Sequence, residues 1–168
     1  HFIQKMHHRQ QQSANKRKSE NEGGDDKEEE EEEGMLFARL DLGQNALGDN
    51  GALQVVKNLA DARITSLDLS ENRIQDQGFE HIATHLANLK CLRRLSLKAN
   101  LAGDKGVGVL CQAMLSGVKT SSSTITDLDV SESHNISQKG GLMLAHLAQR
   151  HPNLSRLLFL SDDLDEAG

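Results

Sequence analysis

Apolar residues recur along most of the chain in a fixed frame with polar residues and one glycine. Residues 40–51 and 67–78 share the pattern L-x-L-x-x-N-x-φ-x-D-x-G, in which φ is apolar, and residues 95–106 repeat it. Successive asparagines of these copies are spaced by 27 and then 28 residues (Asn45, Asn72 and Asn100). A constant period of this length indicates a repeat architecture.

Two further copies of the pattern are weaker. The fourth keeps its apolar positions and Gly140, but Ser133-His134 stands where one asparagine is expected. We therefore predict one inserted residue after Val130 and a different local turn. A fifth copy, residues 157–168, stops where its helix is expected to begin. Because a solenoid normally ends in a capping unit, this ending predicts an array that is truncated at its C-terminal end.

Each copy predicts a short strand, a turn and a helix. The alternation of Leu67 and Leu69 places both side chains on the buried side of a strand. Asn72 follows the strand, and its amide is expected to bond to backbone groups of its own turn and of the next unit. Gly78 is expected to open an amphipathic helix. The predicted inner helix faces are Val55, Val56 and Leu59, then Ile82, Ala83, Leu86 and Leu89, then Leu110, Cys111 and Met114.

This pattern, with a full helix in every unit, resembles the ribonuclease-inhibitor-like subfamily of leucine-rich repeats. That family also includes the repeats of NOD-like receptors and of Ran GTPase-activating proteins. The resemblance covers residues 36–168. It implies an α/β leucine-rich-repeat solenoid, or horseshoe, of about four to five repeats. In such a solenoid the parallel strands line the concave side and the helices form the convex side.

The first part of the chain differs in composition from the repeats. Residues 1–34 hold a basic patch, Lys16-Arg17-Lys18, and an acidic run that ends with Glu28–Glu33. A segment with so little apolar content cannot bury enough surface to offset its ordering entropy. We therefore predict a disordered, low-complexity segment at residues 1–34 and a repeat array at residues 35–168.

The concave strand face is the usual binding surface of a solenoid. Residues that alternate with the buried leucines are expected to point out of this face and form a mixed-charge surface able to dock a protein. Alternatively, its arginines pair with neighbouring aspartates, and exposed ion pairs contribute little, about 0–1 kcal/mol. The candidate binding residues are Arg39, Asp41, Asp68, Arg94, Ser96, Lys98 and Asp129.

Catalytic and metal chemistry find little support in the sequence. There is no glycine-rich phosphate loop and no nucleophile with a base, so we predict no enzyme activity and no cofactor. His81 and His85 have metal-ligand spacing on a predicted helix. A third ligand is not evident, and both flank residues expected to be buried, so we predict solvent-exposed histidines without a metal. Cys111 occupies a small buried position, which predicts a packing role.

The preferred hypothesis is a protein–protein interaction module that binds a partner of unknown identity. The alternatives are a regulator of a small GTPase and the ligand-sensing region of a NOD-like-receptor-type protein. Nucleic acid, membrane and small-molecule partners are not expected. Two cysteines, no bilayer-length apolar run and no leader sequence favour an intracellular protein, cytoplasmic or nuclear. Residues 116–124 lengthen the third unit and predict a loop.

Overall fold

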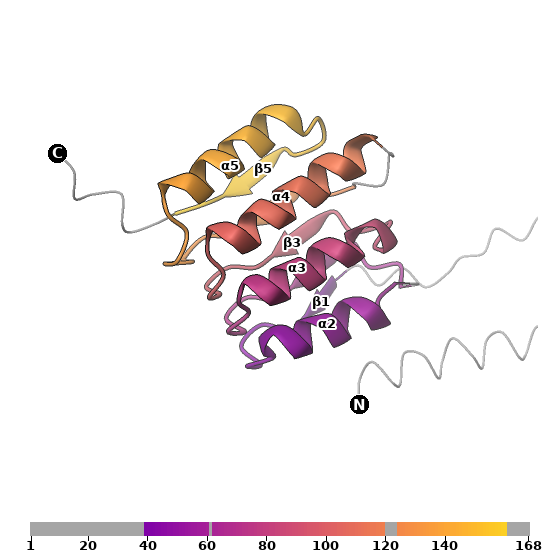
Figure 1. Cartoon of the computed structure of the whole chain (residues 1–168). Helices are drawn as coiled ribbons and strands as arrows, with labels where there is room; N and C mark the ends of the chain where they lie inside the picture. Colours follow the sequence, from indigo (N-terminus) through magenta and orange to yellow (C-terminus); the bar gives the residue numbers. More distant parts are fainter. Residues whose placement is uncertain (1–38, 61, 120–123, 161–168) are drawn as a thin grey trace, which may run out of the picture. The chain divides into compact units, whose positions relative to one another are not determined.

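The computed structural model describes residues 39–60, 62–119 and 124–160. Within them, short strands alternate with helices, and the strands form one parallel sheet in sequence order (Figure 1). The strands are β1 (Arg39–Asp41), β2 (Ser66–Asp68), β3 (Arg94–Ser96), β4 (Asp127–Asp129) and β5 (Arg156–Leu158). The helices are α2 (Gly48–Asn58), α3 (Asp76–His85) with the 3-10 turn η1 (Leu86–Asn88), α4 (Asp104–Lys119) and α5 (Gln138–Arg150). The predicted segment 1–34 lies outside the described residues.

The sheet forms one layer of the repeat array and the helices form the other (Figure 1). Neighbouring strands of a sheet lie about 4.8 Å apart, whereas the axes of packed helices lie about 8–10 Å apart. A stack of strand–helix units therefore curves with its strands on the inner side. The predicted α/β solenoid, with strands on the concave side and helices on the convex side, is confirmed.

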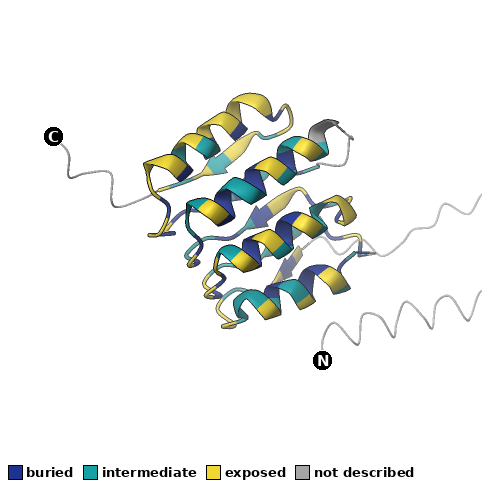
Figure 2. Ribbon diagram, in the orientation of Figure 1, coloured by how far each residue is buried: buried dark blue, intermediate teal, exposed yellow. Residues whose placement is uncertain are grey.

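The core lies between the two layers, where the buried side of each helix faces the sheet (Figure 2). The predicted inner faces of α2 and α4 are confirmed, since all their members are at most 4% exposed. The prediction for α3 was partly wrong. This helix begins at Asp76 rather than Gly78, includes the fully buried Phe79, and ends before Leu86, which is only half-buried in η1.

The asparagines of the pattern tie each unit to the one before it. The Oδ1 atom of Asn72 accepts hydrogen bonds from the backbone amides of Asn45 at 3.0 Å and Leu47 at 3.2 Å. Its Nδ2 atom donates to one carbonyl of the preceding unit and one of its own turn, those of Leu42 and Ser70. The predicted bond within the turn is confirmed. The predicted bonds to the next unit were wrong, because the remaining partners of Asn72 lie in the preceding unit. Backbone N–H groups of each turn point towards the following unit, so the asparagine of that following unit accepts them.

The aspartates of the pattern form a second ladder, for which sequence reasoning had assigned no role. Asp49 Oδ1 accepts hydrogen bonds from the backbone amides of Gln75 at 2.7 Å and Gly78 at 2.9 Å, both in the next unit. Asp76 accepts the equivalent hydrogen bonds from amides at the start of α4, and Asp104 accepts them from amides at the start of α5. A carboxylate that bonds the first amides of a helix satisfies groups that have no partner within that helix. This contact fixes the start of α3 at Asp76.

The fourth unit has its inserted residue after Val130, as predicted. Glu132 has a positive φ of 57°, as Glu71 and Ala99 do at the same position of earlier units. Ser133 therefore occupies the asparagine position, and the extra residue falls after it, at His134 or Asn135. The register holds through Val130 because its amide still bonds to the next strand, at the carbonyl of Leu158.

The predicted loop at residues 116–124 was also partly wrong. Helix α4 continues through Lys119, so the first four residues of this stretch are helical. Residues 120–123 lie outside the described part of the chain. No helix among the described residues is long and apolar enough to cross a membrane.

Candidate functional site

Two columns of side chains run across the exposed face of the sheet, as the alternation predicted. The strand register aligns Arg39, Ser66, Arg94, Asp127 and Arg156 in the first column. It aligns Asp41, Asp68, Ser96, Asp129 and Leu158 in the second column. In β1 to β4 the leucine between the two columns is buried, while the flanking residues are half-buried or exposed. All the candidate binding residues except Lys98 thus lie on one face.

Lys98 lies in the turn after β3, one column further along. Its Nζ atom lies 2.8 Å from Glu132 Oε1 in the turn after β4. The hydrogen bond to Glu132 is the main reason why the pKa of Lys98 is raised above its ordinary value. The lysine therefore extends the face at the ends of the strands with an ion pair between adjacent turns.

The arginines of the first column pair with neighbouring aspartates. Arg39 lies 3.2 Å from Asp41 and 3.9 Å from Asp68, and Arg94 lies 4.0 Å from Asp127. The side chains of Arg39 and Arg94 are 65% and 73% exposed. Ion pairs with this much solvent contribute little to stability, about 0–1 kcal/mol. Both arginines therefore remain accessible on the face.

The aspartates of the second column also hold the turns that follow their strands. Asp41, Asp68 and Asp129 each accept a hydrogen bond from the backbone amide two residues ahead, at 3.0–3.1 Å. A short acidic side chain commonly makes such a local contact. The recurrence of aspartate in this column therefore has a structural cause in addition to its charge, which the sequence reasoning had not found.

A shallow groove of about 790 Å³ follows the strands across this face, and we call it the strand groove. Residues directly before the strands extend it beyond the predicted set, namely Thr65, Arg93 and Thr126. The carbonyl oxygen of each accepts hydrogen bonds from two successive amides of the following unit. These three residues could have been predicted from the sequence, because each directly precedes a strand. With Arg93 included, four arginines and Asp127 lie at or just before the strand starts, and Asp41, Asp68 and Asp129 lie at the strand ends.

Comparisons with known proteins agree with this geometry. A family model described as "Leucine Rich repeat" matches residues 39–55 and 64–83. The ribonuclease inhibitor of Sus scrofa is 36% identical over 78 residues, which are 45% of this chain and 17% of that protein. The chain therefore contains leucine-rich repeats that resemble those of the ribonuclease-inhibitor-like kind. The matched part of the chain spans only 17% of the inhibitor's length.

Solved structures resemble the leucine-rich-repeat array in fold. One is titled "Leiomodin-1 Actin-Binding Site 2 (ABS2)"; it has a TM-score of 0.64 and 18% identity and covers 74% of this chain and 71% of that one. Another is the tropomodulin C-terminal domain from Caenorhabditis elegans, with a TM-score of 0.62, 9% identity and 76% coverage of both chains. At such identities these likenesses show the fold alone.

Metal-ligating and nucleophilic side chains are dispersed over the leucine-rich-repeat array. In the described ranges, no group of three His, Cys, Asp or Glu side chains could hold a metal ion. His85 Nδ1 lies 2.8 Å from the carbonyl oxygen of His81, one helical turn earlier. Cys111 is buried, as predicted, and its burial raises the pKa of the thiol to about 12. This thiol is therefore protonated and packs as an apolar group.

Proposed function

We propose that the leucine-rich-repeat array binds a partner protein through the strand groove. The observation that carries this proposal is the charge arrangement of the groove. Arg39, Arg93, Arg94 and Arg156 lie at or just before the starts of the strands, where Asp127 is the one acidic residue of the aligned column. Asp41, Asp68 and Asp129 lie at the strand ends. Such an arrangement is complementary to a protein surface with an acidic side facing the arginines and a basic side facing the aspartates.

The exposed ion pairs of the groove can be exchanged for contacts with a partner at little cost. Arg94 makes a single long pair, at 4.0 Å, and its side chain is 73% exposed. The chain contains no Trp and no Tyr, the residues that most often anchor protein interfaces. Binding is therefore expected to depend on charge complementarity, with an association rate that falls as salt is raised.

Actin is the first named protein to test as a partner. The leiomodin-1 structure, which resembles this fold, is an actin-binding site. The two alternative functions, regulation of a small GTPase and ligand sensing of the NOD-like-receptor type, stay predictions. Action without catalysis or cofactor, inside the cell, is likewise part of the proposal.

A charge-balanced variant of the full chain tests the strand groove. The variant combines Arg94→Glu with Asp68→Asn and Asp129→Asn. Asparagine keeps the side-chain oxygen that accepts the turn hydrogen bond, so the fold is preserved while the charges change. The control combines Lys57→Glu with Glu80→Lys on the exposed sides of α2 and α3, also without a change in net charge. Circular dichroism first establishes that all three proteins fold alike.

Each protein is then immobilised and exposed to purified actin and to cell lysate. We expect at least one protein to bind the native chain and the control, and to bind the groove variant about tenfold more weakly or not at all. Equal capture by the native chain and the groove variant would falsify the strand groove as the binding site. Stimulated GTP hydrolysis by a captured GTPase would favour the first alternative instead.

A further inference from the structure

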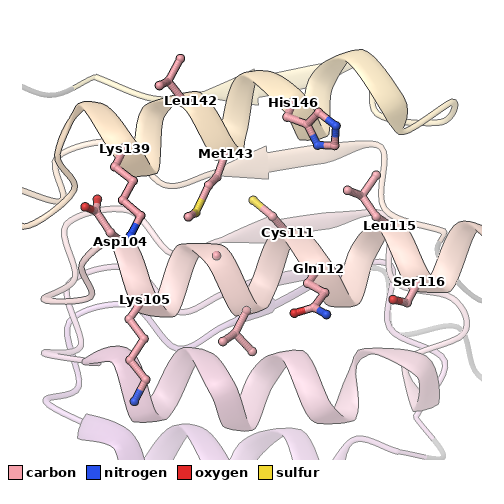
Figure 3. Close-up of a pocket in the computed structure, with 12 residues that line it drawn as sticks. Asp104, Lys105, Cys111, Gln112, Leu115, Ser116, Lys139, Leu142, Met143 and His146 are labelled. Atoms are coloured by element: carbon pink, nitrogen blue, oxygen red, sulfur yellow. The ribbon is translucent and has the colours of Figure 1, made fainter.

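A second surface lies on the helical side of the array, between α4 and α5 (Figure 3). It is a groove of about 990 Å³, which we call the helix groove. Its apolar lining includes Val109, Leu115, Leu142 and Met143, and the sulfur of Cys111 faces it (Figure 3). Leu142 is 66% exposed, a large exposure for a leucine. Isolated exposed leucines are common, but an exposed leucine on the wall of an apolar groove indicates a contact surface.

The absence of a side chain at Gly108 shapes this groove. In the same position of the preceding units, α2 has Leu53 and α3 has Glu80. A Cβ atom at Gly108 would lie 3.0 Å from the Met143 sulfur. The flexible Met143 side chain of α5 therefore packs directly against the α4 backbone at Gly108. Glycine inside a helix is less favourable than alanine. Methionine adapts its shape to different partners, which suits a docking surface.

One end of the helix groove is positively charged. The N-termini of α4 and α5 lie there, and each helix N-terminus carries a partial positive charge. Lys105 and Lys139 line the same end, and no ion pair within 4.0 Å joins either one to a carboxylate of the described residues. The carboxylate of Asp104 also lies there, accepts hydrogen bonds from Ser137 and Gly140, and interacts electrostatically with Lys139. Two lysines and one aspartate leave this end with one net positive charge. This end therefore matches a carboxylate on a bound molecule.

We propose that the helix groove binds an amphipathic helix of a partner protein. The apolar stripe of that helix packs on Leu142 and Met143, and carboxylates at one of its ends face Lys105 and Lys139. A helix laid in an apolar groove is a recurrent mode of peptide recognition, with anchors at helical spacing. This surface consists of helix residues only and is separate from the strand groove, so the proposal does not rest on the function proposed above.

The absence of Trp from the chain makes a direct binding experiment possible. The probe is a helical peptide of about four turns with leucines on one face, one Trp in that stripe and glutamates at one end, matching the anchor spacing of helix recognition. A second peptide has lysines in place of the glutamates. Trp emission is recorded as the full-length protein is added. The methyl resonances of isotope-labelled methionines, which include Met143 in the groove and Met114 in the core, locate the contact.

The variants are designed to leave the fold intact. Leu142→Glu changes a 66% exposed leucine of the groove, and Leu101→Glu changes a 49% exposed leucine outside it, as the matched control. We expect the glutamate peptide to shift the Met143 methyl resonance, and Leu142→Glu to weaken its binding at least about tenfold while Leu101→Glu does not. Lys105→Glu with Lys139→Glu should weaken the glutamate peptide about fivefold and strengthen the lysine peptide.

Three results would overturn the proposal. The first is that neither peptide binds, and the second is that Leu142→Glu and Leu101→Glu weaken binding equally. The third is a concentration-dependent dimer of the native chain that Leu142→Glu converts to a monomer in sedimentation experiments. That result would identify a second copy of the chain, rather than a helix of another protein, as the occupant of the groove.

Discussion

The Oδ1 atom of Asp76 lies 2.8 Å from the backbone nitrogen of Gly106, 30 residues further along the chain. A Cβ atom at Gly106 would meet this same oxygen at 2.8 Å and the Cα atom of Asp76 at 3.0 Å. The aspartate of one unit thus occupies the space that a side chain would need in the next. The recurring aspartate and glycine of the repeat pattern are therefore two halves of one contact between neighbouring units.

Gly106→Ala tests this pairing. We expect it to lower the free energy of unfolding by about 1–3 kcal/mol, because the new methyl group collides with backbone atoms that cannot move independently. Gly108→Ala, two residues later in the same helix, is the control. There the nearest atom is the end of the flexible Met143 side chain, so alanine is expected to change stability by less than about 1 kcal/mol, in the stabilising direction. Urea denaturation measures both; equal losses would contradict the pairing.

The sequence predicted the fold well because the repeat fixes both the period and the buried positions. The strand–helix order and the inner faces of α2 and α4 followed from the spacing of apolar residues, and the parallel strands followed from the resemblance to the ribonuclease-inhibitor-like repeats. The misplaced start of α3 has a specific cause. The start of α3 depends on Asp49, a residue 27 positions before Asp76, and the spacing of apolar residues within the helix does not reveal that contact.

The candidate site was predictable only as a surface. Alternation placed Arg39, Asp68 and Arg94 on the strand face, and the register places them on three successive strands. The turn-holding role of the aspartates needed the backbone geometry after each strand. The helix groove could not be predicted, because it depends on the contact between Gly108 and Met143, which lie on different helices.

Asn100→Ala is expected to be among the most destabilising single substitutions in the array. The buried Asn100 amide bonds to five backbone groups in two units, so its loss should cost about 3 kcal/mol. Asn45→Ala is the matched control, because the exposed Asn45 amide bonds only to two carbonyls of its own turn. Its cost should be below about 1 kcal/mol. Comparable unfolding midpoints for the two variants would argue against an asparagine ladder.

Ser133→Asn is expected to stabilise the fourth unit. Ser133 occupies the asparagine position and is 1% exposed, yet its Oγ atom has no hydrogen-bond partner among the residues that the structure describes. An asparagine can offer Oδ1 to the amides of Asn100 and Ala102, as Asn100 does for Asn72 and Ile74. The gain should be about 1 kcal/mol in the free energy of unfolding.

Ser133→Ala separates hydrogen bonding from packing in that experiment. An unpartnered buried hydroxyl costs free energy, so its removal should leave stability unchanged or raise it slightly. Thermal unfolding of the native chain and the two variants makes the comparison. A clear loss with Ser133→Ala would mean that the hydroxyl has a partner, and the expectation for Ser133→Asn would fail with it.

Asp104 is expected to make the link between the third and fourth units sensitive to acid. Its oxygens accept hydrogen bonds from the Ser137 hydroxyl at 2.6 Å and from the Ser137 and Gly140 amides at 2.8 and 3.0 Å. The Ser137 hydroxyl is the main reason why the pKa of Asp104 lies below its ordinary value of 3.8. A carboxylate whose pKa is lower in the folded state contributes its full stabilisation at pH values above its ordinary pKa. This contribution is lost as the pH falls through the lowered pKa of the folded state.

Urea denaturation of the native chain and of Asp104→Asn between pH 7 and about pH 2 measures this contribution. Asparagine keeps an acceptor for the two amides but does not titrate, so the variant should be less stable at neutral pH and lose less stability on acidification. The two stability curves should therefore converge below pH 3.8. Ser137→Ala should move the convergence to higher pH, because it removes the hydroxyl that favours the charged carboxylate. Curves that stay parallel over the whole range would show that Asp104 does not couple the two units through its charge.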